Sequence, residues 1–296
     1  MDEATRLPRD RAGDCPTCGR AGEPYAVSAE FYDVVHGERY HREALALAGP
    51  AAAARVGIVE LGAGTGLVTD VLLGASSVPV HAVEPAGPMR AVLLSRLARA
   101  DPAQRARVTV HPCPAERLGL ASRADLAVCL RVIAGLPPDE RRAVWRSLAH
   151  WLLPGGLLFV DRPPKGLPDA PRSYRLGEAR IGADVYSARL SERAEAGRIR
   201  LDFSYLVHRD GRLLRRAAET FHQWPLPEAE LDRELTAAGF ARDGEPVPPL
   251  LRLRRLDRPS RPSPSSVARS AERRRPSPIR SADLPSAAND PDPHGQ

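Results

Sequence analysis

The sequence predicts a doubly wound α/β fold whose mostly parallel sheet carries an antiparallel β insertion after its fifth strand. Five short apolar runs alternate with helical patterns between residues 55 and 161. These runs are continuously apolar, which is typical of strands covered on both faces in a parallel sheet. From residue 185 onward, strand patterns follow one another without intervening helices. The change marks the insertion.

The five strands and their helices follow from local patterns. Strands are expected, in chain order, at 55–61, 79–85, 107–112, 124–132 and 155–161. Helices are expected at 66–74, 88–100 and 137–153. Pro88 suits a first helical turn. In the last of these helices, Asp139 and Glu140 favour the first turn, and Pro154-Gly155 is expected to end the helix.

The insertion is expected at about residues 172–224. Apolar Ile199, Leu201, Phe203, Tyr205 and Val207 alternate with polar residues, which is the pattern of a half-buried strand. Asp210-Gly211 is a strong two-residue hairpin signal. A helix at 226–240 and a closing strand at 249–256 follow.

Composition divides the chain into three parts. Residues 1–27 are expected to form a flexible arm, 28–256 a single domain, and 257–296 a disordered tail rich in proline, serine and arginine. No run approaches the roughly 18 apolar residues of a membrane span. The charged N-terminal stretch does not resemble a signal peptide. The expected location is the cytoplasm, without membrane contact.

The net charge of +6 is weak evidence for a nucleic acid partner. Of 43 lysines and arginines, Lys165 is the only lysine, a bias that GC-rich coding alone produces. The basic residues are interleaved with 37 acids. Arg273, Arg274 and Arg275 in the tail are therefore interpreted as part of a solvated extension.

No metal site is predicted. Cys15 and Cys18 have the spacing of two zinc ligands, and His36 and His41 are the only nearby histidines to complete a set. Both histidines lie in an expected helix after a long gap, so two free thiols are favoured.

The stretch ELGAGTG after the first strand is the central motif. It reads E-x-G-x-G-x-G, whereas a dinucleotide fingerprint needs glycine at position 67, which is leucine. The Gly-Lys-Ser/Thr of a P-loop is absent. Glu60 beside the loop repels phosphate and suits an ammonium group. The loop is therefore predicted to let a ligand approach its backbone closely, with an ammonium group of that ligand beside Glu60.

A second acid, Glu84, ends the second strand roughly 20 residues later, where an acidic residue can accept both hydroxyls of a ribose. A ribose and an amino acid ammonium within one ligand describe S-adenosylmethionine.

At this point the sequence resembles the class I S-adenosylmethionine-dependent methyltransferases over roughly residues 28–165. VELGAGTG, HAVEP, CPAERL, ADLAVCLRVIAGL and LLPGGLLFV are similar to the successive motifs of that family. The SAEFYDVVHGERY lead-in and the later β insertion are similar to members that act on small molecules, including sugars and natural products. The resemblance implies a Rossmann-like methyltransferase sheet.

The resemblance also implies a set of cofactor-binding residues. The methionine portion would lie against Glu60, Gly62, Ala63, Gly64 and Gly66. Glu84 would hold the ribose, Pro85 and Met89 would flank the adenine, and Ala115 and Glu116 would border its amino group. Leu130 and Arg131 would close over the sulfonium. Tyr32 would belong to a helical lid, although a role in the core is an equal alternative.

Methyl transfer requires a base only if the acceptor must lose a proton before attack. His36, Tyr174 and His222 are the candidates, on residue type alone. Gly135 stands where related small-molecule enzymes often carry histidine. The Asp/Asn-Pro-Pro-aromatic motif of nucleic acid amine methyltransferases is absent after the fourth strand.

These observations predict an S-adenosylmethionine-dependent methyltransferase that modifies an O or N atom of a small molecule. The alternatives are an RNA methyltransferase and a non-catalytic regulatory protein that binds the cofactor. The acceptor, the base and the oligomeric state stay open.

Overall fold

A computed structural model describes residues 23–120, 123–244 and 250–257. The predictions for the first 22 residues, including Cys15 and Cys18, and for the tail from residue 258 lie outside the described residues. So do the arginines at 273–275.

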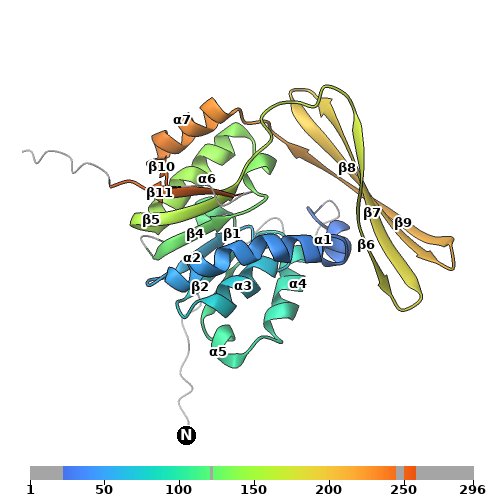
Figure 1. Cartoon of the computed structure of the whole chain (residues 1–296), viewed down its shortest axis with the longest axis horizontal. Helices are drawn as coiled ribbons and strands as arrows, with labels where there is room; N and C mark the ends of the chain where they lie inside the picture. The colour runs from blue at the N-terminus through green and yellow to red at the C-terminus, as the bar shows by residue number, and fades with distance from the viewer. Residues whose placement is uncertain (1–22, 121–122, 245–249, 258–296) are drawn as a thin grey trace, which may run out of the picture. The chain divides into compact units, whose positions relative to one another are not determined.

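The central sheet has seven strands in the order β10-β11-β5-β4-β1-β2-β3 (Figure 1). Its parallel strands are β1 (Ile58–Leu61), β2 (Val80–Val83), β3 (Val108–His111), β4 (Ala124–Cys129) and β5 (Leu152–Asp161). β1 pairs with β2 on one side and with β4 on the other, all in parallel. The strand order therefore reverses next to β1, and ligands bind at such a switch point in open α/β sheets.

Helices cover both faces of this sheet. The helices are α1 (Ser28–Ala44), α2 (Ala48–Ala53), α3 (Leu67–Ala75), α4 (Gly87–Leu97), α5 (Pro102–Arg105), α6 (Pro138–Trp151) and α7 (Glu228–Ala238), with short 3₁₀ turns η1 (Leu45–Leu47), η2 (Ala115–Arg117) and η3 (Ile133–Gly135). One core contains Trp145 and Trp151 of α6, and a second contains Leu47 and Leu72 beside α2 and α3. The doubly wound prediction is confirmed.

The boundary between α6 and β5 differs from the prediction. The helix ends at Trp151, and β5 already includes Pro154 and Gly155. The pairing between β4 and β5 is irregular at this point. Ala124 pairs with Leu152 and Leu126 pairs with Leu157, so a step of two residues along β4 corresponds to a step of five along β5. This irregularity places the proline and glycine where no regular ladder is required.

The far edge of the sheet is antiparallel. β11 (Leu250–Arg255) pairs with β5, as expected for the closing strand, and the unpredicted β10 (Phe240–Arg242) pairs with β11. Beneath this edge, the buried Arg141 donates two hydrogen bonds of 2.9 Å to Glu234, which joins α6 to α7.

The insertion is a separate four-stranded antiparallel sheet of β6 (Arg172–Ile181), β7 (Asp184–Glu195), β8 (Arg198–Arg209) and β9 (Arg212–Gln223). The predicted turn at Asp210-Gly211 is confirmed, with φ values of 48° and 76°. Both residues of a type I′ turn require positive φ.

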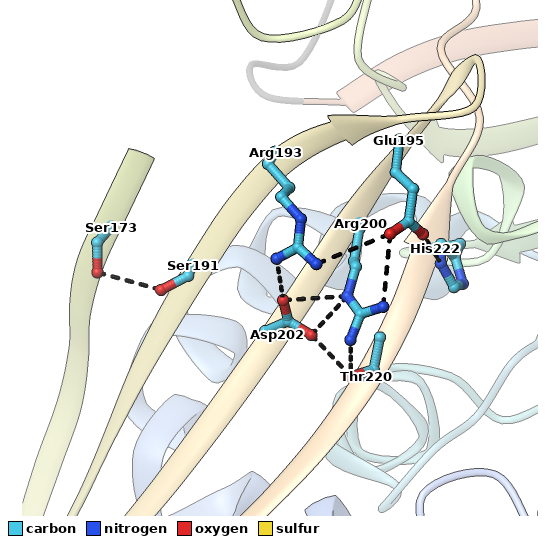
Figure 2. Close-up of polar contacts among 8 residues, drawn as sticks. All are labelled: Ser173, Ser191, Arg193, Glu195, Arg200, Asp202, Thr220 and His222. Carbon is cyan, nitrogen blue, oxygen red and sulfur yellow. Dashed lines mark hydrogen bonds and ion pairs between the residues drawn. The ribbon is translucent and has the colours of Figure 1, made fainter. Parts of the chain in front are cut away.

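The two faces of the insertion differ. On one face, Tyr205 and Val207 of β8 pack with Phe31 and Val35 of α1. Gly177 of β6 approaches the α1 backbone so closely that a Cβ atom there would lie 2.0 Å from the carbonyl oxygen of Val35. The opposite face carries paired charged side chains (Figure 2). We call these the inner and outer faces.

Candidate active site

The glycine loop lies at the carboxyl end of β1. Gly62, Gly64 and Gly66 adopt φ values of 74°, 58° and 90°. α3 begins at Leu67, immediately after the loop. The loop therefore places the N-terminus of α3 at the switch point of the sheet, as the motif predicts. The loop's own N–H groups at Gly62, Ala63, Gly64 and Gly66 donate to Val83, Glu84 and Ala63.

Glu84 closes this loop from the end of β2. Its Oε2 accepts a hydrogen bond of 2.7 Å from the Gly64 N–H, and its Oε1 accepts one of 2.8 Å from the Ala86 N–H. Burial raises the pKa of this carboxyl, and the two backbone hydrogen bonds oppose that rise. The carboxylate is therefore held at the rim of the loop.

Glu60 lies deeper and is 2 % exposed. The Thr69 hydroxyl donates a hydrogen bond of 2.6 Å to its Oε2. Burial, assisted by the negative charge of Glu84, raises the pKa of Glu60 to about 8. At neutral pH this side chain is mostly protonated until a cation lies beside it.

We expect cofactor binding at pH 7 to release a proton from Glu60, because an ammonium group favours the ionised carboxylate. Calorimetric titration in buffers of different ionisation enthalpy measures this proton. The release should fade as pH rises through about 8 and should disappear in Glu60→Gln. Equal release by the variant would contradict the assignment.

The same raised pKa affects stability. The ligand-free protein should be stabilised by the neutral Glu60 below its ordinary pKa near 4.5, and that contribution should be lost as pH rises through about 8.

A pocket forms around these acids and brings together most of the predicted cofactor residues. Nine predicted residues line it: Tyr32, Glu60, Gly62, Ala63, Gly64, Glu84, Met89, Leu130 and Arg131. Further lining comes from Tyr25, Leu61, Thr65, Leu67, Val68, Val128 and Val132.

Four predicted residues lie outside this lining. A Cβ atom on Gly66 would meet Leu93 of α4, so this glycine serves helix packing. Pro85 is exposed at the turn after β2. Ala115 and Glu116 both belong to η2, where Ala115 is buried and Glu116 is exposed.

Tyr25 lines the pocket but was not predicted to do so, since it falls in the expected N-terminal arm. Its φ is 66°, a strained value for a tyrosine. Its ring centroid lies 4.8 Å from that of Phe221 on β9. Tyr25 therefore connects the pocket to the inner face of the insertion. No local sequence signal marks it, because the contact spans almost two hundred residues.

Thr65 is a second unpredicted residue, although it lies inside the glycine motif. Its hydroxyl donates a hydrogen bond of 2.5 Å to Asp33 on α1. Arg96 of α4 pairs with the same aspartate and with Asp70 of α3. These contacts fasten α1 over the glycine loop.

Tyr32 has contacts on two sides. It lines the pocket from α1 and also packs in a small cluster with Ala29, Ala86 and Met89. Burial raises its pKa well above the ordinary value, and the charge of Arg131 opposes this rise.

None of the three base candidates lines the pocket. His36 is 8 % exposed and stacks on Tyr40, with ring centroids 4.9 Å apart. Burial, together with Arg39 and Arg131, lowers its pKa to about 4. These observations favour a packing role for His36.

The other two candidates lie on the insertion. His222 lies on the outer face, with Nε2 3.0 Å from a carboxylate oxygen of Glu195 (Figure 2). The hydroxyl of Tyr174 on β6 donates a hydrogen bond of 2.8 Å to Glu192.

Within the described ranges, His, Cys, Asp and Glu side chains nowhere form a group of three or more that could hold a metal ion. In the same part of the chain, no helix is long and apolar enough to cross a membrane.

Comparison with known proteins concerns the domain and its fold. Residues 59–158 match the family model for a methyltransferase domain. No curated protein matched the sequence.

Three solved structures share the fold. They are CalS10, an amino pentose methyltransferase from Micromonospora echinaspora (20% identity, TM-score 0.62, 80% of this chain and 100% of that chain); DesVI from Streptomyces venezuelae (20%, 0.62, 78% and 98%); and the sugar N-methyltransferase KedS8 from Streptoalloteichus sp ATCC 53650 (18%, 0.57, 86% and 100%). At these identities the likeness concerns the fold.

The parallel sheet, the glycine loop with its two acids and the match over residues 59–158 agree with a methyltransferase domain. The chain shares its fold with CalS10, a methyltransferase whose structure contains S-adenosylmethionine.

Proposed function

We propose that this protein is an S-adenosylmethionine-dependent methyltransferase, and that it methylates a nitrogen atom of a small molecule bound between the cofactor pocket and the inner face of the insertion. The observation that carries the proposal is the contact of Tyr25, which lines the pocket, with Phe221 of β9. A molecule held against the inner face would therefore lie beside the reactive end of the cofactor.

A second contact brings β9 to the same place. The backbone N–H of Trp224, just after β9, donates a hydrogen bond of 2.7 Å to the carbonyl of Ala134. Ala134 belongs to η3, which directly follows the pocket residues Arg131 and Val132. The inner face also offers polar side chains, since Tyr174 and Glu192 share it with Phe203 by strand register. These groups suit a polar acceptor of small size.

Nitrogen is favoured over oxygen by the placement of the two histidine candidates. A hydroxyl must lose its proton during attack, whereas a neutral amine attacks through its lone pair and loses the proton afterwards. His36 packs in a ring cluster and His222 lies on the outer face. Among the described residues that line the pocket there is no histidine. The amine and sugar substrates in the names of CalS10 and KedS8 are consistent with this choice.

The cofactor supplies a methyl group made electrophilic by positive sulfur. Glu60 would hold the ammonium group of the cofactor, and Glu84 would hold its ribose hydroxyls. The glycine loop would lie along its methionine portion. Leu130 would present an apolar surface near the transferred methyl. Holding nucleophile and methyl in line contributes roughly 7–11 kcal/mol to such a reaction. The protein's main task is therefore orientation.

The test is turnover with matched acceptors. We expect S-adenosylhomocysteine to form with small amino sugars and not with the counterparts that carry hydroxyl in place of the amine. Nuclear magnetic resonance of the product would place the methyl group. Equal turnover of the hydroxyl compounds would contradict N-methylation.

An RNA acceptor is the alternative. On the outer face, Arg193 and Arg200 both pair with Asp202 and with Glu195, so two carboxylates offset these two arginines (Figure 2). A salt-sensitive gel shift with RNA would revive the alternative.

A further inference from the structure

Arg131 occupies an unusual position at the carboxyl end of β4. Its φ is 58°, a left-handed conformation that an arginine rarely adopts. Its backbone N–H donates a hydrogen bond of 2.6 Å to the carboxylate of Asp161 at the end of β5. Strained backbone of this kind persists where the surroundings hold it and concentrates at functional sites.

The guanidinium of Arg131 is positioned by α1. It lies 3.8 Å from the ring centroid of Tyr40, and its Nη1 lies 3.2 Å from Oε2 of Glu43. The side chain is 27% exposed, and the residue lines the cofactor pocket. A guanidinium carries five N–H donors in a planar fork, so it can bind a second carboxylate beside Glu43.

Arg131 is also the one basic residue among the described residues that line the pocket. Its charge lowers the pKa of Glu60 against the larger effect of burial. The two residues line the same pocket and carry opposite charges once Glu60 ionises. An α-amino acid carries the matching pair of groups, an ammonium and a carboxylate on neighbouring atoms.

If the Arg131 guanidinium lay over the sulfonium, its positive charge would meet the positive sulfur in a partly buried site, where like charges repel strongly. We propose that Arg131 instead binds the carboxylate of the methionine portion of S-adenosylmethionine, while Glu60 binds its ammonium. This assignment rests on the cofactor pocket described above and does not depend on the acceptor. It makes the pocket selective for ligands with an intact amino acid end.

The assignment also explains why α1 must be in place. Tyr40 and Glu43 of α1 hold the guanidinium, and Asp161 of β5 holds the backbone that carries it. An α1 that moves away would release the guanidinium from its orientation. Carboxylate binding therefore depends on the position of α1.

The first experiment compares two ligands on the unaltered protein by calorimetry: S-adenosylmethionine and decarboxylated S-adenosylmethionine. We expect the decarboxylated ligand to bind about 10- to 100-fold more weakly, because a charge-assisted hydrogen bond to the carboxylate is lost. Equal affinity for the two ligands overturns the proposal without any variant. Binding of neither ligand by folded protein overturns the cofactor site as well.

The second experiment repeats both titrations with Arg131→Gln. The variant should lose about 10- to 100-fold in affinity for S-adenosylmethionine and nothing for the decarboxylated ligand. Equal losses for both ligands would show a purely structural role and overturn the proposal. Arg131→Lys keeps the charge and should retain part of the preference.

Arg39→Gln is the matched control. Arg39 also lies near the Tyr40 ring, at 5.9 Å, and pairs with Glu43, but it does not line the pocket. We expect it to leave the affinity for both ligands unchanged. If it reproduced the ligand-selective loss of Arg131→Gln, the effect would arise from α1 packing and the carboxylate assignment would be wrong.

Discussion

Alanine at position 62 is expected to destabilise the protein by about 2–5 kcal/mol and to remove measurable cofactor binding. Gly62 adopts a φ of 74°, which costs about 1–2 kcal/mol for a residue with a Cβ atom. That atom would also lie 2.3 Å from Cγ2 of Val132, an overlap of the kind that costs about 1–3 kcal/mol. Urea unfolding and calorimetric titration measure the two effects.

Gly64→Ala is the matched control for Gly62→Ala. Its φ of 58° imposes similar strain, but a Cβ atom there meets only the Gly62 carbonyl oxygen at 4.0 Å. We expect a loss of about 1–2 kcal/mol from strain alone. Adding Val132→Ala to Gly62→Ala should recover stability in proportion to the clash. Equal destabilisation by the two glycine variants would show that Val132 moves aside freely.

The parts of the fold that the sequence predicts correctly are those that local physics determines. The strands around Ile58, Val80 and Leu126 are mostly apolar because hydrophobic cores pack against both faces of the sheet. The Asp210-Gly211 turn is equally local, since two consecutive positive φ values select these residue types.

The parts that were missed depend on contacts between distant segments. Pro154 and Gly155 look like a helix end, but the register between β4 and β5 accommodates them inside a strand. β10 has only three residues and exists because β11 pairs with it. Neither feature has a signal within a short window of sequence.

The candidate site shows the same division. Glu60 and Glu84 follow from their positions at strand ends, and both line the pocket. Tyr25 reaches the pocket only because the chain returns nearly two hundred residues later with Phe221.

The base candidates follow from residue type alone, and residue type does not determine which way a side chain points. Neighbouring residues of a strand point to opposite faces of the sheet, so His222 lies on the outer face because Phe221 lies on the inner face. The sequence of β9 alone does not show which of its two faces is the inner one.

Glu84→Ala is expected to weaken S-adenosylmethionine binding by about 10- to 150-fold, which corresponds to about 1.5–3 kcal/mol for hydrogen bonds to a charged acceptor. Part of this loss has a second cause, because the variant also removes the partner of the Gly64 and Ala86 N–H groups. Loosening of the glycine loop would weaken every ligand of the pocket equally.

A ligand without ribose hydroxyls separates the two contributions. Against a 2′,3′-dideoxy analogue of S-adenosylhomocysteine, Glu84→Ala should cost only the loop contribution, whereas the ribose contribution should vanish. Glu116→Ala, which removes an exposed carboxylate outside the pocket lining, should bind both ligands as the unaltered protein does. If Glu84→Ala weakened the two ligands equally, Glu84 would be a support for the glycine loop and not a ribose-binding residue.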